Sequence, residues 1–258
     1  MLKARQRLGK YRIEKRLANG PLAAVYRAYD TIHGLRVALK IPHRRMMDEH
    51  FLADFRREVQ LSTRLNHPNI LPIQNADFVG SYFVIALPLG EEALGDRLTR
   101  RMSSRKALAY TGQILAGVSH AHEHRIIHCD IKPDNFILFP DGRLRLTDFG
   151  FAKLARGRLD ASGSGTIGYI APEQAVGRPM FQSDVFSSGL VLYRMFTGKL
   201  PSWPYDWPPK GHRRLRQKLS KSMVRLIRRA IEVDPDERFP DAVAMHEAFE
   251  RIRRPLAD

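Results

Sequence analysis

Two short motifs, the octapeptide HCDIKPDN and the tripeptide DFG that follows it, constrain this chain more than any other feature. Asp130 can orient and deprotonate a hydroxyl group, and Lys132, two positions later in an extended loop, can meet a phosphate on the same side. Asn135 and Asp148 offer one neutral and one charged oxygen, which suit a hard divalent cation that keeps some of its waters. Together these groups are the parts that phosphoryl transfer requires.

Each motif alone has an ordinary explanation, since Asp130 could be a turn residue and Asp148 could open a tight hairpin. In this order, however, they resemble the catalytic loop and metal-binding segment of eukaryotic-type (Hanks-type) Ser/Thr protein kinases, in the form of a bacterial-like stand-alone catalytic domain. The resemblance covers nearly all of the chain and implies an α+β, two-lobed fold. One kinase domain would span residues 1–258, with a small, mainly antiparallel β N-lobe that carries one helix over about 1–87 and a larger, mainly α C-lobe over about 88–258.

A lysine and a glutamate extend this resemblance toward ATP. Val37–Lys40 resembles the V-A-I-K strand of the family, so Lys40 is expected to hold the α- and β-phosphates. Glu58 lies in a predicted helix, nine residues before His67–Ile70. The resemblance implies that Glu58 pairs with Lys40, although it could also be one more solvated acid beside two arginines.

The segment after DFG matches the family as well. Ala171–Glu173 resembles the A-P-E signature, so the activation loop is expected to end there. Thr166 shortly before it is implied to hydrogen-bond Asp130 and Lys132, which would tie these two residues to the substrate-binding segment.

Two charged residues of the second half are implied to be structural. Asp184 resembles the buried acid that accepts backbone N–H groups of the catalytic loop, although it could also be a plain residue of a helix N-terminus. Arg238 matches the arginine that pairs with Glu173, and such a buried pair sets the register of the lobe more than it adds net stability.

The resemblance also implies an adenine site that would be completed by the nucleotide, in a region that could otherwise be ordinary core. Ile85 would be the gatekeeper, and the hinge would follow it directly. The expected nucleotide-binding residues are Leu17, Gly20, Val25, Ala38, Lys40, Ile85, Ala86, Leu87 and Ile137.

The phosphate-covering loop departs from the family pattern. Where the pattern is G-x-G-x-x-G-x-V, this chain reads ANGPLAAV, so only Gly20 remains. Ala18 and Ala23 restrict the backbone, and Pro21 stiffens the tip and removes an N–H. We therefore predict a weaker grip on ATP.

Cys129 stands where most members of the family have an arginine. That arginine receives an activation-loop phosphate through charge-assisted hydrogen bonds. Ser162, Ser164 and Thr166 remain candidate phosphorylation sites, but their main contact is missing. We favour a small buried apolar role for Cys129 over a redox sensor, because no sequence feature indicates a lowered thiol pKa.

The chain is strongly basic, with 43 Lys and Arg against 27 Asp and Glu, a net charge of +16 and a pI near 10.4. Nine basic residues and no acid lie between Lys210 and Arg229. A biased composition is the favoured explanation. Acidic substrates or an acidic partner are alternatives, and nucleic acid is disfavoured because no nucleic-acid module or interleaved aromatic residues accompany the charge. The apolar side of this segment carries Leu215, Leu219, Met223, Leu226 and Ile227.

The remaining composition sets broad limits. No apolar run reaches the length of a membrane span, and the basic start lacks the apolar core of a signal peptide, so we expect a cytoplasmic protein without a membrane partner. The single cysteine cannot form an internal disulfide. Of the clustered histidines, only the four-apart pairs His120/His124 and His124/His128 could converge, and we favour no zinc site. Nothing in the sequence indicates the oligomeric state.

Periodicity predicts strands first and helices later. Gly198 is a predicted C-cap and Ser220 a predicted N-cap. The predicted strands are 11–17, 24–29, 36–41, 70–78 and 82–87; the predicted helices are 48–65, 104–124, 184–197, 220–232 and 240–252.

The leading hypothesis is a protein Ser/Thr kinase that uses ATP and Mg²⁺ and acts on protein substrates, with acidic proteins among the candidates. The first alternative is a pseudokinase, a nucleotide-responsive binding module marked by the altered glycine loop and by Cys129. The retention of Lys40, Glu58, Asp130 and both predicted metal ligands argues against it. A small-molecule phosphotransferase would not need Thr166 and the A-P-E segment.

Overall fold

The computed structural model of this chain describes residues 2–43, 53, 56, 59–60, 62–149 and 167–253. The helix predicted over 48–65 lies largely outside these residues, and Glu58, Ser162, Ser164 and Thr166 also lie outside them. The chain forms two compact units, one of Met1–Asn66 with Leu71–Glu91 and one of His67–Ile70 with Glu92–Asp258.

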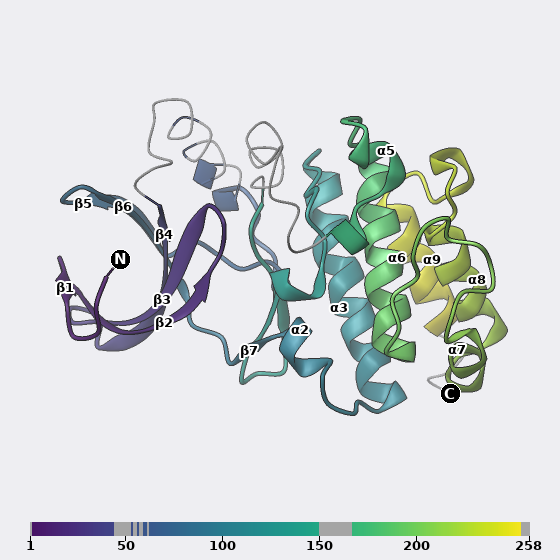
Figure 1. Cartoon of the computed structure of the whole chain (residues 1–258), viewed down its shortest axis with the longest axis horizontal. Coiled ribbons are helices and arrows are strands. Elements are labelled where there is room, and N and C mark those ends of the chain that lie inside the picture. Colours follow the sequence, from purple (N-terminus) through teal and green to yellow (C-terminus); the bar gives the residue numbers. More distant parts are fainter. Residues whose placement is uncertain are drawn as a thin grey trace. The chain divides into compact units, whose positions relative to one another are not determined.

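The first unit is built on a six-stranded antiparallel sheet, drawn in purple and blue in Figure 1. Its strand order is β1-β2-β3-β4-β6-β5, so consecutive strands pair except where β6 lies between β4 and β5. The strands are β1 (Arg7–Leu8), β2 (Tyr11–Asn19), β3 (Ala23–Asp30), β4 (Leu35–Pro42), β5 (Asn75–Val79) and β6 (Tyr82–Pro88).

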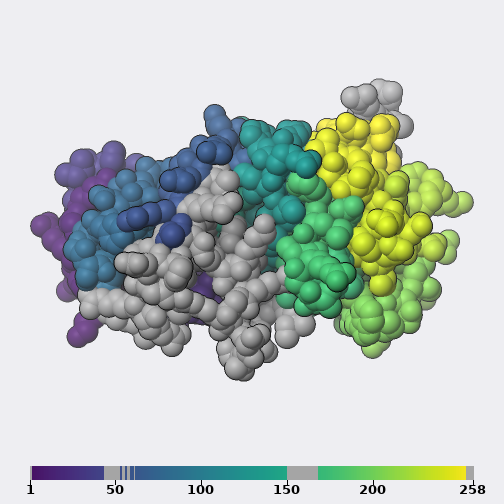
Figure 2. Space-filling model, turned by 90° about the horizontal axis from the view of Figure 1, so that it is seen from above, coloured from purple at the N-terminus to yellow at the C-terminus, as the bar shows by residue number. Residues whose placement is uncertain are grey.

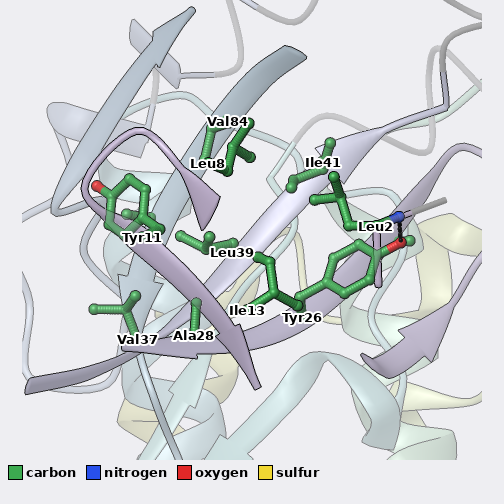
Figure 3. Close-up of a cluster of buried hydrophobic side chains, with 12 residues drawn as sticks. Leu2, Leu8, Tyr11, Ile13, Tyr26, Ala28, Val37, Leu39, Ile41 and Val84 are labelled. Atoms are coloured by element: carbon green, nitrogen blue, oxygen red, sulfur yellow. Dashed lines mark hydrogen bonds between the residues drawn. The ribbon is translucent and has the colours of Figure 1, made fainter. Parts of the chain in front are cut away.

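Alternation along the strands creates one apolar core in this unit, because successive side chains of a strand point to opposite faces. Tyr26 of β3, Leu39 of β4 and Ala86 of β6 stand opposite one another in the register and are buried together. Figure 3 shows the cluster closed by the N-terminal segment, where the Leu2 backbone N–H donates to the Tyr26 hydroxyl at 3.4 Å. One face of the sheet therefore packs into this core.

The prediction of a strand from residue 70 was wrong at its start. Strand β5 begins at Asn75, and Ile70 instead forms an isolated parallel bridge with Leu146. The carbonyl of Asn69 accepts the N–H of Leu146 at 2.9 Å, and the Asn69 side chain donates to the carbonyl of Leu144 at 2.9 Å. These bonds attach His67–Ile70 to the second unit, so this segment cannot extend β5.

The second unit is mainly helical, drawn from teal to yellow in Figure 1, and carries a small sheet in the order β7-β8-β9. Helix α6 is buried along nearly its whole length, including the polar side chains of Ser183, Asp184, Ser187 and Ser188. The strands are β7 (Glu92–Ala93), β8 (Phe136–Leu138) and β9 (Leu144–Leu146). The α-helices are α2 (Leu94–Arg97), α3 (Ser104–Glu123), α5 (Pro172–Ala175), α6 (Phe181–Thr197), α7 (His212–Lys218), α8 (Lys221–Ala230) and α9 (Ala242–Arg253), and the 3-10 turns are η2 (Pro133–Asn135), η3 (Ile167–Tyr169) and η4 (Pro235–Glu237).

Both predicted caps are confirmed. Gly198 ends α6 in the left-handed conformation at φ 73°, which glycine reaches without steric cost. The Ser220 hydroxyl accepts the N–H of Met223 at 3.3 Å and starts α8. Helix α6 begins at Phe181, three residues before the prediction, because the Ser183 hydroxyl accepts the N–H of Met180 at 3.1 Å and caps an extra turn.

Gly189 permits the close contact between α6 and α8. A Cβ at this position would lie 2.6 Å from Ile231 Cγ2 and 2.8 Å from Ala230 Cβ. We expect Gly189→Ala to lower the free energy of unfolding, since overpacking costs about 1–3 kcal/mol and exceeds the gain in helix propensity of about 1 kcal/mol. Urea unfolding measures the change.

The matched control is Gly112→Ala in α3, where the nearest atom to a new Cβ is a ring carbon of Phe249 at 3.3 Å. A ring edge can yield by a few tenths of an ångström, so this loss should be smaller. A Gly189→Ala protein at least as stable as the wild type would contradict the proposed packing.

Candidate active site

The predicted base, cation and amide lie together in the second unit, in the loop before β8. The Asp130 Oδ2 atom is 2.8 Å from Lys132 Nζ and 2.9 Å from Asn135 Nδ2. The Asp130 side chain is 28% exposed, so it is held by two donors and still open to a substrate.

Asn135 is oriented by the same loop. Its Nδ2 group also donates to the backbone carbonyl of Asp130 at 2.8 Å, so Asp130 is the acceptor in both of these bonds. Because the amide nitrogen is used in this way, Oδ1 is the atom of Asn135 that can serve a cation. The residue is buried, which fixes this orientation.

His128 connects the catalytic loop to the DFG segment. Its Nδ1 accepts the N–H of Asp130 at 3.2 Å, so its Nε2 carries the proton that is donated to the carbonyl of Thr147 at 2.8 Å. The Thr147 N–H donates to the carbonyl of Asn135 at 2.9 Å. Both polar groups of the Thr147 backbone are thus tied to the loop, which places the next residue, Asp148, beside it.

Two residues of the site adopt positive φ angles without being glycine, Cys129 at 65° and Asp148 at 67°. Such a conformation costs an L-residue about 1–2 kcal/mol, and it persists only where the surroundings hold it. The N–H of Cys129 donates to Asp184 Oδ1 at 2.9 Å, and the carbonyl of Cys129 accepts from the Gln174 side chain. The reversed turn at Cys129 then presents Asp130 outward.

Asp184 has the predicted role of a buried acceptor for the catalytic loop. Its carboxylate accepts the backbone N–H of His128 at 2.7 Å and that of Cys129 at 2.9 Å, and it contacts His122 Nε2 at 3.0 Å. The other nitrogen of His122 accepts the N–H of Ala242, so Nε2 is the protonated one. Burial would raise the pKa of Asp184, but the hydrogen bond from His122 and the neighbouring donors lower it below its ordinary value.

The predicted pair of Glu173 and Arg238 is also present. Two parallel bonds join the groups, Nη1 to Oε1 at 2.9 Å and Nη2 to Oε2 at 3.0 Å. Burial of Glu173 opposes ionisation, but the hydrogen bonds from Arg238 and Ser183 lower its pKa overall. The guanidinium also donates to three backbone carbonyls, those of Gln182, Glu232 and Val233. Arg238 therefore anchors the A-P-E helix α5 to the segment before α9.

In the first unit, one row of the sheet holds Lys40 between two predicted nucleotide residues. Val25 of β3 and Ile85 of β6 stand directly opposite Lys40, so all three side chains point to the same face. Ala38 and Leu87 form the pair two residues along and share that face. It is the face opposite the apolar core cluster.

Other predicted nucleotide residues do not join this row. The Ala86 side chain lies on the opposite face in the apolar core, and its carbonyl accepts the N–H of Gln74 at 2.9 Å. Leu17 lies beside a register shift in β2 and is 44% exposed. Ile137 is half-buried in β8 of the second unit. Alternation along the predicted strand 82–87 already implies that Ala86 faces away from its neighbours Ile85 and Leu87.

The altered glycine loop is closed by its own hydrogen bonds and by a residue that the sequence analysis missed. The Gly20 N–H donates to the Ala23 carbonyl at 2.9 Å. His43, just after β4, donates from Nε2 to the Gly20 carbonyl at 2.8 Å and from its backbone to the Leu22 carbonyl at 2.9 Å. No motif marked His43, because its role arises only from the pairing of β3 with β4.

Three histidines of the second unit, His67, His120 and His124, lie close together. The rings of His67 and His120 are stacked with centroids 4.9 Å apart, and those of His120 and His124 are 4.4 Å apart. Among the residues that the structure describes, no group of three or more His, Cys, Asp or Glu could hold a metal ion. His128, in contrast, is fully engaged in the catalytic loop.

Comparison with known proteins decides the family. The profile of the protein kinase domain matches residues 11–250. The chain belongs to the protein kinase family. A solved structure of the kinase domain of Mycobacterium tuberculosis PknI has a TM-score of 0.73 and 25% identity, covering 97% of this chain and 99% of that one. The predicted two-lobed α+β kinase fold is thereby confirmed.

Curated kinases are similar over most of this chain. A probable serine/threonine-protein kinase of Clostridium acetobutylicum is 31% identical over 255 residues, which is 90% of this chain and 38% of that protein. The serine/threonine-protein kinase PknA of M. tuberculosis is 36% identical over 207 residues, which is 75% of this chain and 48% of that protein. This kinase chain thus spans less than half the length of these relatives. Within its described part, no helix combines the length and apolarity needed to cross a bilayer.

The stacked histidines predict a pH-dependent stability of this kinase chain. Burial and the neighbouring His120 lower the pKa of His67, and burial and the neighbouring His124 lower the pKa of His120. Because the unfolded chain has ordinary histidine pKa values near about 6.5, it binds more protons than the folded chain as the pH falls below that value. The contribution of these two histidines to the free energy of unfolding is therefore fully present above neutral pH and is lost as the pH falls. The urea midpoint should fall between pH 7.5 and pH 5.5.

The control is His67→Asn with His120→Gln, in which the amide oxygen introduced at position 67 can still accept the N–H of Asn69 that His67 Nδ1 accepts at 3.1 Å. Both proteins keep the same carboxylates, and only the wild type has these two imidazoles. The urea midpoint of the variant should therefore fall less between pH 7.5 and pH 5.5 than that of the wild type. Equal falls in the two proteins would assign the pH dependence to other groups.

Proposed function

We propose that this chain is an ATP-dependent protein serine/threonine kinase. The observation that carries the proposal is the arrangement of Asp130, Lys132 and Asn135, with Asp130 Oδ2 within 2.9 Å of both donors. One oxygen of the carboxylate is oriented by the loop, and a partly exposed carboxylate can take the proton of an attacking hydroxyl.

Asp130 orients the acceptor hydroxyl and takes its proton as the bond from the hydroxyl oxygen to the γ-phosphorus forms and the bond from the γ-phosphorus to the β,γ-bridging oxygen breaks, which releases ADP. The Lys132 ammonium lies 2.8 Å from Asp130 Oδ2, and its positive charge next to the base suits the γ-phosphate. Asn135 Oδ1 and the Asp148 carboxylate fit Mg²⁺, which prefers oxygen ligands. Bound Mg²⁺ would neutralise the charge of the phosphate oxygens.

The nucleotide contacts are proposed from the family resemblance and the sheet register. Lys40, with Glu58 as its partner, would hold the α- and β-phosphates. The side chains that share the Lys40 face, Val25, Ala38, Ile85 and Leu87, would contact the adenine ring. The bonds that close the Gly20 loop leave fewer free N–H groups for phosphate, which supports a modest affinity for ATP.

The acceptor class is proposed from two features. The relatives are named serine/threonine-protein kinases. Lys132 in the catalytic loop and Thr166 before the A-P-E segment match the Ser/Thr pattern. A short hydroxyl side chain on a protein is therefore the proposed substrate.

A pseudokinase is the second candidate, favoured by the loop that His43 and Ala23 close around Gly20. It requires that the base and the metal ligands be present without turnover. The Asp130 carboxylate is held by two donors and is still partly exposed, a geometry that suits removal of a proton from a substrate hydroxyl, so the active enzyme is the stronger proposal.

Substitution of the catalytic groups tests the function. Asp130→Asn, Lys40→Met and Asp148→Ala should each reduce phosphate transfer from radiolabelled ATP to generic protein acceptors by at least about 100-fold. Circular dichroism should show that the variants are folded, and phosphoamino-acid analysis should find phosphoserine and phosphothreonine. Wild-type rates in the folded Asp130→Asn protein would refute the assignment, and predominant phosphotyrosine would refute the acceptor class.

Activity should not depend on phosphorylation of Ser162 or Ser164, because Cys129 offers no cation to a loop phosphate. Contacts with exposed arginines would contribute about 1 kcal/mol or less, whereas a near-complete switch requires about 5.5 kcal/mol. Initial rates of phosphatase-treated wild type and of Ser162→Ala/Ser164→Ala should therefore match those of untreated enzyme. A tenfold loss of kcat in both would mean that another basic residue receives the phosphate.

A further inference from the structure

The nine cations between residues 210 and 229 divide into two groups in the structure. Four have structural roles. Arg214 and Lys218 donate to the last carbonyls of α6, those of Thr197 at 3.2 Å and Phe196 at 2.8 Å. Arg228 lies over the Trp207 ring and Arg229 over the Phe239 ring.

The other five cations form an exposed group that we name the basic face. In the part of the chain that the structure describes, none of them has a carboxylate within salt-bridge distance. They lie at exposed positions in and just before α7 and α8, whose apolar side is buried in the second unit. Figure 2 shows the yellow-green segment that holds these helices at the surface, beside α9 in yellow. The basic face consists of Lys210, Arg213, Arg216, Lys221 and Arg225.

The placement of these cations costs stability. Arg213 and Lys221 lie in the first turns of α7 and α8, where the helix dipole disfavours positive charge, and neither first turn contains an acid. Arg213 and Arg216 are three apart, and Lys221 and Arg225 four apart, so like charges are neighbours on each helix. Two successive helices therefore carry positive charge from their first turns onward without an acid in either turn, which leaves this surface suited to an acidic partner.

The chain that leads from α6 to the basic face touches the segment before the A-P-E helix. The Tyr169 hydroxyl accepts from Arg194 Nη1 at 2.7 Å, which brings one more cation next to that segment. A Cβ on Gly168 would lie 2.7 Å from Leu200 Cδ2, so the chain that leads from α6 to α7 touches the same segment. Trp203 on this connection is 67% exposed.

We propose that the basic face binds an acidic segment of the protein substrate, a proposal that rests on the kinase function proposed above. Charge complementarity selects a partner rich in Asp and Glu, and the connection to residues 167–170 places it on the substrate side of the domain. An extended acidic segment can contact both helices and the connecting chain.

Protein is favoured over nucleic acid by the aromatic residues of this region. Single-stranded nucleic acid needs open rings on which bases stack. Trp207 is instead occupied, with the His212 ring against it edge to face at 5.0 Å and the Arg228 guanidinium 5.8 Å from its centroid. Only Trp203 is largely exposed among the described tryptophans.

The test compares binding of two labelled serine peptides by fluorescence anisotropy, one with a run of Asp and Glu and one with Asn and Gln in their place. The protein variant is Arg213→Glu/Lys221→Glu, which removes both first-turn cations. The acidic peptide should bind the wild type more tightly than the neutral peptide does. Its Kd for the variant should be about tenfold higher than its Kd for the wild type. The free energy of unfolding of the variant should stay equal or rise, because acids suit these turns.

The control variant is Arg101→Glu/Arg105→Glu, which changes the net charge equally at two exposed cations just before and in the first turn of α3. It should leave the Kd unchanged. Equal losses in both variants, or no loss in the first, would overturn the proposal. Displacement of the acidic peptide by single-stranded DNA at lower concentration than by unlabelled peptide would also overturn it.

Phosphorylation of the same peptides separates this proposal from the proposed function. The Arg213→Glu/Lys221→Glu variant should raise KM for the acidic peptide and leave kcat unchanged. Absence of transfer to any acceptor, with selective binding of the acidic peptide intact, would reject the kinase function and retain the binding surface.

Discussion

The buried carboxylate of Asp184 is the constraint on which the catalytic loop depends. Removing a charge from water costs several kcal/mol, and hydrogen bonds from His122 and from the backbones of His128 and Cys129 offset that cost. The same bonds hold Cys129 at a positive φ angle. The stability of α6, which carries Asp184, is thereby coupled to the direction in which Asp130 points.

From this anchor, a chain of satisfied polar groups reaches the proposed metal ligands, Asn135 and Asp148. His122 Nδ1 accepts the N–H of Ala242, 120 residues away, and this bond sets which nitrogen of His122 carries the proton. His128 in turn donates to the carbonyl of Thr147. A buried network in which every member is paired is rigid, whereas a partly paired one is costly. Substitutions remote from the substrate, such as at His122, should therefore act on the geometry of Asp130 rather than on its chemistry.

The sequence was informative wherever local chemistry or motif order determined the outcome. Ser220 and Gly198 predicted caps because their side chains or conformational freedom act within one turn, and Arg238 followed from the order of the family motifs. The start of β5 and the role of His43 could not be predicted. Both depend on which distant backbone groups pair, as with Asn69 and β9, and no local pattern encodes that pairing.

The net charge is a second property whose role the sequence could not predict, because composition gives the number of cations but not their partners. A biased composition accounts for Arg214 and Lys218, which lie at the C-terminal end of α6 where positive charge is favourable. It does not account for Arg213 and Lys221, which lie at helix starts without an acid nearby in the first turn. Among the described residues, the five cations of the basic face have no carboxylate within salt-bridge distance, and the helices that carry most of them follow Leu200, the residue in contact with Gly168. The succession of two basic helices after the chain that touches Gly168, more than the size of the net charge, supports a binding role for this face.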